Sequence, residues 1–143
     1  MSVPAGVPIT FEELLQVTAN APDHPAITDY GVPFAAAART SARALDRDIY
    51  HGVHAKAAAL LDTLLRHPWL EHHQATAAWT ALTAMLAFNG WHPRPDAKRA
   101  EVADLLARVA GPGVAIADLA RELRALTERS VPSAEDADPS RGD

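Results

Sequence analysis

Apolar residues recur at helical spacing along almost the whole chain, and this periodicity constrains the fold most strongly. Val53, Ala57, Leu60, Leu61 and Leu64 follow one another in steps that place them on one face of a helix. No stretch of useful length alternates between apolar and polar residues, and no internal repeat is visible. The pattern predicts an all-α fold, a compact single-domain bundle of about six helices.

The first three helices have recognisable boundary signals. A capping box, in which Thr and Glu are three positions apart, precedes the first helix at 10–13. Pro33 suits the first turn of a second, Ala-rich helix that is expected to end near Leu45. The third helix must stop at about His67, because Pro68 disfavours helical backbone in the residue before it.

Three further helices are expected in the second half of the chain. The fourth helix begins at about 71–73 and ends before Gly90, which favours a helix C-terminus. Asp96 is expected to cap the fifth helix, and the Gly-Pro-Gly sequence at 111–113 breaks it. A sixth helix then carries an apolar face between residues 116 and 126.

Length and composition indicate a single domain. The chain has 143 residues, and 48% of them are hydrophobic, which is enough for one core but not for two. We assign residues 1–9 to an N-terminal extension and residues 10–128 to the helical domain. The polar, Pro-bearing segment 129–143 lacks large apolar anchors, so we predict a disordered tail there.

Charge and hydropathy exclude some function classes. A net charge of −5 argues against nucleic acid as a partner, since a binder of nucleic acid needs a basic face to neutralise phosphates. The N-terminus shows neither a basic region nor an apolar signal sequence, and no apolar run is long enough to span a bilayer. The chain has no cysteine. We therefore expect a cytoplasmic protein that does not bind membranes.

The segment HPWLEHHQAT, residues 67–76, contains the side chains best suited to catalysis or ligand binding. His67 closes one helix and Glu71, His72 and His73 open the next, so these side chains can converge across a tight corner. A histidine at a helix C-terminus is stabilised as imidazolium, and a helix N-terminus can hold an anion. The same residues could also form only a helix corner, with Trp69 as a core anchor.

Several other polar and aromatic residues could serve either a site or the structure. His67, Glu71, His72 and His73 could ligate a metal, but adjacent helical residues point about 100° apart, so no metal site is assigned. His51 and His54 are expected to flank a solvated helix start. Trp69, Trp79 and Trp91 could line a small-molecule pocket or belong to the core. Arg66 and Arg94 could bring cations to the corner or be surface charges.

The chain resembles the Fic/Doc family, specifically its short Doc toxin branch, over roughly residues 9–127. That branch has a Lys-Ala-Ala-Ala-Leu-Leu helix, then the motif His-Pro-Phe-x-Asp-Gly-Asn-Lys-Arg-Thr-Ala, then a helix ending in Asn-Gly. The matching pieces here are KAAALL at 56–61, HPW at 67–69, TA at 76–77 and NG at 89–90, with TDYG at 28–31 near the family's Asp-x-Gly segment.

The resemblance implies a role for each position of the motif. His67 would act as the general base on a target hydroxyl, and Glu71 would replace the aspartate that helps hold Mg²⁺ and the nucleotide. The family's anion hole and its phosphate-binding Lys and Arg are replaced by His72, His73, Gln74 and Ala75. Removing one preorganised donor from such a site typically lowers the rate by ~10²–10³. Standard AMP or phosphoryl transfer with Mg²⁺ and a nucleotide is therefore not expected.

Two functions from different classes follow. In the first, the chain is a repurposed enzyme in which His67 acts as acid and base on a small-molecule substrate. Glu71, His72 and His73 then complete the catalytic set, and Arg66, Trp69 and Gln74 bind substrate. In the second, it is a pseudoenzyme, a toxin-component homologue of a toxin–antitoxin pair, that binds an antitoxin-like helix or another protein in the old groove.

Overall fold

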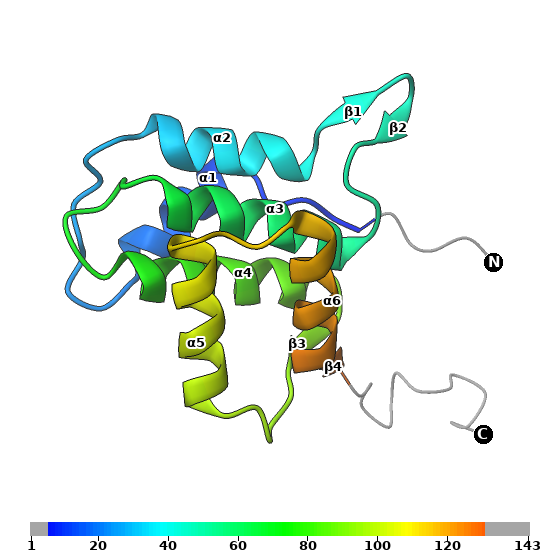
Figure 1. Cartoon of the computed structure of the whole chain (residues 1–143). Coiled ribbons are helices and arrows are strands. Elements are labelled where there is room, and N and C mark those ends of the chain that lie inside the picture. The colour runs from blue at the N-terminus through cyan, green and yellow to red at the C-terminus, as the bar shows by residue number, and fades with distance from the viewer. Residues whose placement is uncertain (1–5, 131–143) are drawn as a thin grey trace, which may run out of the picture.

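Helix α3 (Val53–Arg66) runs through the centre of the fold. The computed structural model describes residues 6–130, and within them α2, α4, α5 and α6 all pack against α3 (Figure 1). Ten of the 14 residues of α3 are buried, so its surface is covered on nearly every side. The predicted apolar face of this helix is confirmed, since Ala57, Leu60, Leu61 and Leu64 are all fully buried.

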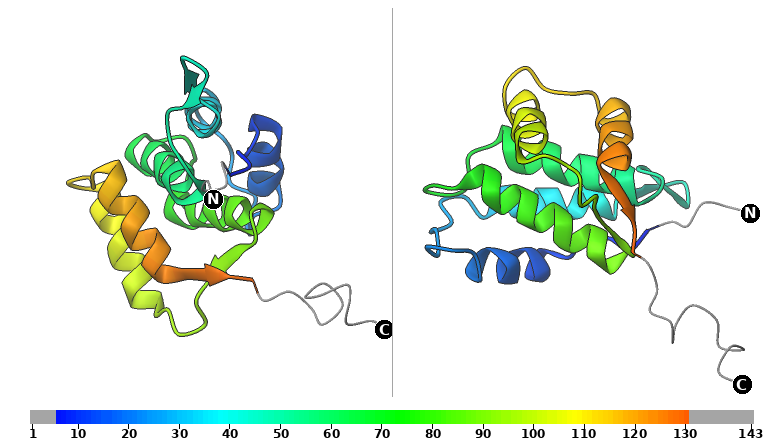
Figure 2. Two further views of the ribbon diagram at one scale, coloured as in Figure 1. Left: turned by 90° about the vertical axis from the view of Figure 1, so that its right-hand side faces the viewer. Right: turned by 90° about the horizontal axis from the view of Figure 1, so that it is seen from below.

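Six helices and four short strands are present in residues 6–130. The other elements, in chain order, are α1 (Phe11–Ala19), α2 (Gly31–Thr40), β1 (Arg43–Ala44), β2 (Arg47–Asp48), α4 (Gln74–Phe88), β3 (Trp91–Pro93), α5 (Arg99–Ala110), α6 (Ile116–Leu126) and β4 (Thr127–Arg129). Helices α5 and α6 run side by side (Figures 1 and 2), and Arg108 on α5 forms a bidentate ion pair with Glu122 on α6. The fold is thus predominantly helical, as predicted.

The prediction of no strands is wrong in two places. Residues 43–48 form a β-hairpin where the second helix was expected to continue to Leu45, and Leu45 is instead 96% exposed at the tip with a left-handed φ of 51°. The hairpin is anchored by Lys56 of α3, which is almost fully buried and whose Nζ lies 3.0 Å from Asp48 Oδ2. Strands of two residues are too short to show any alternation in sequence.

The second strand pair joins the two halves of the chain. Strand β3, directly after α4, pairs antiparallel with β4, directly after α6, and Trp91 lies opposite Arg129. The backbone N–H of Ser130 extends this contact by donating to Gly90 O at 2.8 Å. Paired structure therefore passes the predicted domain boundary at 128, while the rest of the predicted tail, 131–143, lies outside the described residues.

Most predicted helix boundaries agree with the structure. Thr10 and Glu13 form both hydrogen bonds of the capping box before α1. His67 is extended (φ −126°, ψ 125°) and ends α3, as the following proline requires. Two boundaries differ from the prediction. Helix α2 ends at Thr40 rather than near Leu45, and Lys98 occupies the N-cap of α5 while the Asp96 carboxylate pairs with Arg94.

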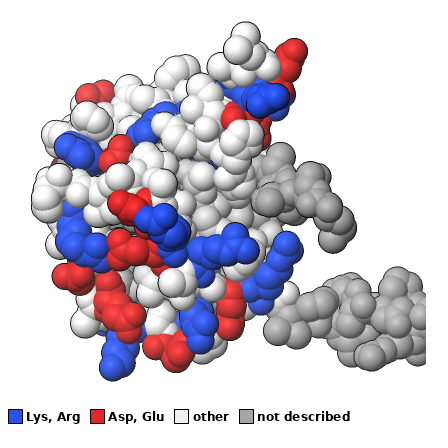
Figure 3. Space-filling model, turned by 45° about the vertical axis from the view of Figure 1, so that its right-hand side comes forward, with Lys and Arg blue, Asp and Glu red and all other residues white. Residues whose placement is uncertain are grey.

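The N-terminal segment is part of the packed structure from residue 6 onward. Ile9 is only 1% exposed, and the amide of Asn89 at the end of α4 donates to Val7 O. Residues 6–9 of the predicted extension are thus anchored to the fold, with Ile9 in the core, and residues 1–5 lie outside the described part. No helix within 6–130 has the length and apolar character needed to cross a membrane. Basic and acidic side chains are interspersed over the face seen in Figure 3.

Candidate functional site

The corner between α3 and α4 is fixed by the loop that joins α1 to α2. Thr28 donates its backbone N–H to Trp69 O at 2.8 Å, and Glu71 donates its N–H to Ala26 O at 3.0 Å. Ile27 and Leu70 form an isolated antiparallel bridge between these hydrogen bonds. The predicted convergence of two helix ends is therefore present, and a second loop determines its backbone conformation.

Two of the three predicted substrate-binding residues are used inside the corner. Trp69 is fully buried, and its indole Nε1–H donates to Leu64 O at 3.0 Å. The Gln74 amide accepts the backbone N–H of Trp69 at 2.9 Å and donates to His67 O at 3.1 Å. Trp69 is thus a core anchor, and Gln74 is a brace for the corner backbone.

The third predicted substrate-binding residue, Arg66, is directed toward another loop. Its guanidinium lies against Gly113, in the turn between α5 and α6, where φ is +89° and a Cβ would collide with it. Arg94 lies beyond β3 and pairs with Asp96. Arg94 therefore does not replace the Lys and Arg that the family motif carries at the corner.

The carboxylate and the two adjacent imidazoles of the corner contact one another and the α1–α2 loop. Glu71 Oε1 accepts the backbone N–H of Ala26 at 3.0 Å and lies 3.6 Å from His72 Nδ1. His73 Nε2 lies 3.3 Å from Asp23 Oδ2, and the rings of His72 and His73 meet edge to face at 4.5 Å. The His73 backbone is left-handed, with φ of 58°, at the N-cap of α4.

His67 is the predicted catalytic residue whose side chain is exposed and whose ring forms no hydrogen bond or ion pair within residues 6–130. A cavity of about 200 Å³ beside the corner is lined by Asp23, His73 and Thr76 but not by His67. In the described part of the chain, no three His, Asp or Glu residues are grouped closely enough to hold a metal ion. The corner offers an exposed imidazole outside the neighbouring cavity.

Comparisons with known proteins do not assign this chain to a group. No protein-family model matches it, and no curated protein matches it significantly.

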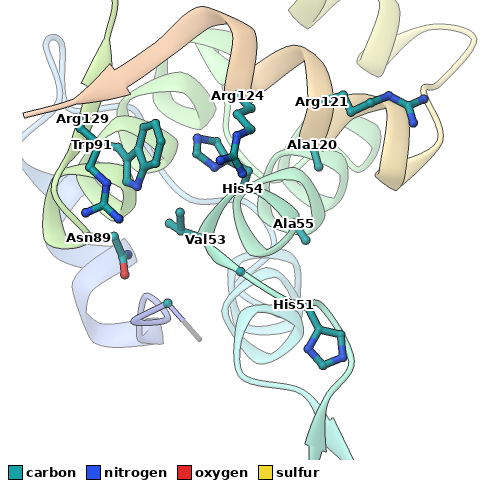
Figure 4. Close-up of a pocket in the computed structure, with 12 residues that line it drawn as sticks. His51, Val53, His54, Ala55, Asn89, Trp91, Ala120, Arg121, Arg124 and Arg129 are labelled. Atoms are coloured by element: carbon teal, nitrogen blue, oxygen red, sulfur yellow. The ribbon is translucent and has the colours of Figure 1, made fainter. Parts of the chain in front are cut away.

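A larger cavity that sequence reasoning missed lies at the opposite end of α3. It has a volume of about 410 Å³, and its lining includes His54, Trp91, Arg124 and Arg129 (Figure 4). His54 was expected at a solvated helix start, but it is only 7% exposed and its ring meets the Trp91 ring edge to face at 4.5 Å. The one available signal was the pair of polar residues on α3, His54 and Lys56, within an otherwise apolar run.

Hydrogen bonding indicates the tautomer of His54. Thr127 Oγ1 donates to Leu123 O at 2.8 Å, so the same oxygen must accept from His54 Nε2–H at 2.9 Å. That leaves Nδ1 as an acceptor. Burial, reinforced by the positive charge of Arg124, lowers the pKa of His54 from 6.5 to about 4, so the ring is neutral at pH 7.

The left-handed backbone of His73 generates a prediction about stability. Left-handed backbone is tolerated best by Gly and Asn, is found more often for His than for most side chains, and is most costly for β-branched ones. We expect His73→Asn to raise the free energy of unfolding by about 0.5 kcal/mol and His73→Val to lower it by about 1–2 kcal/mol. The same two substitutions at His72, whose φ is negative, are the matched controls, and denaturant unfolding measures all four. Equal effects at both positions would contradict the assignment.

The buried His54 predicts a pH dependence. Because its pKa is about 4 in the folded protein and near 6.5 in the unfolded chain, the unfolded state binds the proton first as the pH falls. The contribution to stability is complete above pH 6.5 and is lost between pH 6.5 and 4, by about 2–3 kcal/mol. We expect His54→Gln to flatten this decline in urea unfolding and the exposed control His51→Gln to leave it unchanged.

Proposed function

We propose that this chain is a Fic/Doc-like protein that acts by binding a protein partner through the end of the bundle that carries the α3–α4 corner. The observation that carries the proposal is the exposure of large aromatic side chains next to that corner. Tyr30 and Phe34, at the start of α2, are 58% and 60% exposed. Aromatic residues are enriched among those that dominate the energy of protein interfaces.

The corner and the exposed aromatic side chains belong to one connected surface region. The loop that leads into α2 is hydrogen-bonded to the corner through Thr28 and Trp69, and Tyr30 follows two residues later. Phe34 is held by an edge-to-face contact with Phe11 of α1, with ring centroids 5.4 Å apart. A partner that covers Phe34 would therefore meet a positioned ring, which loses little conformational entropy on binding.

The chemistry of the corner favours binding over nucleotide transfer. Gln74 is used by the backbone of the corner, and Ala75, at the family's arginine position, has no polar group. His72 and His73 lie next to the carboxylates of Glu71 and Asp23, whose negative charge disfavours phosphate at this place. A nucleoside triphosphate at this helix start could contact the backbone N–H groups of α4, but the Lys and Arg of the family motif are missing.

A repurposed acid–base enzyme is the second candidate, and the exposure of His67 favours it. A free imidazole at a helix C-terminus can accept a proton from a substrate hydroxyl. His67 does not line the cavity next to the corner, so a substrate for this residue would bind on the open surface. In this version the partner of the first candidate would also be the substrate.

Site-specific photo-crosslinking tests the proposed binding surface. We expect a benzoylphenylalanine at position 34 to give one discrete protein adduct in the native cells, because this position lies on the proposed interface. Position 88 at the far end of α4, where Phe88 is 47% exposed, is the matched control and should give none. Mass spectrometry identifies the adduct, and Tyr30→Ser should reduce its yield several-fold. Identical adducts from positions 34 and 88, or no adduct from position 34, would contradict the proposal.

Nucleotide calorimetry tests the lost phosphate contacts. We expect no binding of ATP, GTP or CDP at the α3–α4 corner in the presence of Mg²⁺, because the cationic side chains of the family motif are missing there. A variant with the family residues restored, His72→Gly/His73→Asn/Gln74→Lys/Ala75→Arg, should gain binding of a nucleotide if the corner is Fic/Doc-like. Tight nucleotide binding at this corner by the unchanged chain would instead support the standard transferase function. A folded restored variant that binds none of the three would argue against the Fic/Doc resemblance.

A further inference from the structure

The cavity at the N-terminal end of α3 combines three features that favour a negatively charged ligand. It is separate from the α3–α4 corner, because the 14 residues of α3 span about 20 Å at 1.5 Å per residue. Its walls come mainly from three separate parts of the chain: α3, β3, and α6 with the adjoining β4. Its volume of about 410 Å³ lies within the range of small-molecule sites.

The first feature is an excess of positive charge. Arg124 and Arg129 lie with their guanidinium carbons 5.8 and 5.3 Å from the centre of the Trp91 ring, and neither forms an ion pair within residues 6–130. Among residues 6–130, no Asp or Glu lines this cavity, whereas Arg121 points away from it and pairs with Asp118 (Figure 4). Two guanidinium groups therefore border the cavity without a compensating carboxylate on its walls.

The second feature is the uncapped start of α3. The backbone N–H of Lys56 is the first that is bonded within the helix, to Gly52 O, so the N–H groups of residues 53–55 have no partner in the described structure. Gly52 at the N-cap has no side chain to satisfy them, and the first turn contains no acidic residue. Residues 53–55 all line the cavity, so the positive end of the helix dipole adds to the charge of the arginines.

The third feature is an imidazole nitrogen that lies at the cavity without a hydrogen-bond donor among the described residues. His54 is only 7% exposed, and its Nε2–H is used by Thr127. Its other nitrogen, Nδ1, has no hydrogen-bond partner in the described residues, and the ring lines the cavity between Trp91 and Arg124 (Figure 4). A ligand that carries an O–H or N–H group next to its negative charge could donate a hydrogen bond to this nitrogen.

We propose that this cavity binds a small phosphate monoester that carries hydroxyl groups. The phosphate would be held by the guanidinium groups of Arg124 and Arg129 and by the N–H groups at the start of α3, since both are preferred partners of phosphate oxygens. A hydroxyl of the ligand would donate to His54 Nδ1, and the Trp91 ring would form the apolar wall. This site is independent of the function proposed for the α3–α4 corner.

NMR titration of the full-length protein with ribose 5-phosphate tests the proposal. We expect saturable shifts of the Trp91 indole N–H and of the amides of residues 53–55, with a dissociation constant that rises with salt concentration. Arg124→Gln and Arg129→Gln should each weaken binding at least tenfold, because each removes a charge-assisted contact with the phosphate. The charge-matched control is Arg47→Gln, on the exposed β-hairpin, and it should bind like the wild type.

Two further probes separate phosphate recognition from weaker effects. Ribose, which lacks the phosphate, should cause no saturable shift, and inorganic phosphate should bind more weakly than the ester because it offers no contact with Trp91. His54→Gln should weaken the ester more than inorganic phosphate. The proposal is overturned if ribose 5-phosphate gives no saturable shift at low salt, or if Arg47→Gln weakens binding as much as Arg124→Gln does.

Discussion

The burial of α3 is the constraint on which the rest of the structure depends. Ala57, Ala58, Leu60, Leu61 and Leu64 are fully buried, so four other helices must surround this one. Small residues along it allow close approach of its neighbours, and the leucines fill the space between them. Once the sides of the central helix are covered, only its two ends remain open to a ligand or a partner. Both candidate sites lie at these ends.

The two ends differ in what the neighbouring residues do. At the C-terminal end, Trp69, Gln74 and Glu71 direct hydrogen-bonding groups at backbone of the corner or of the adjoining loop. These contacts stabilise the turn, but they remove the same groups from a substrate. At the N-terminal end, the walls of the cavity come from β3, β4 and α6, and the arginines there have no carboxylate to neutralise them within residues 6–130. The C-terminal end of α3 therefore offers a rigid surface for a partner, and the N-terminal end offers positive charge for a ligand.

Sequence reasoning succeeded where the signal was local. The capping box at Thr10, the helix stop at His67 before Pro68 and the apolar faces all depend on neighbouring residues, and all agree with the structure. It failed where distant segments meet. The β3–β4 pair brings Trp91 next to Arg129, and no local pattern announces a contact between strands 38 positions apart. His54 was misplaced for the same reason, because Trp91 and Thr127 bury it from outside its own helix.

The charges around α3 also explain why the site that favours an anion lies outside the segment that resembles the Fic/Doc motif. In the Fic/Doc motif, phosphate contacts are expected at the start of the helix that follows the histidine, which here is α4. That helix begins at Gln74, after the left-handed N-cap residue His73, and has no Lys or Arg in its first turn. The start of α3 also lacks a cap, but Arg124 and Arg129 stand beside it. Because backbone dipoles and guanidinium groups add at one end and not at the other, an anion is favoured at the start of α3, about 20 Å from His67.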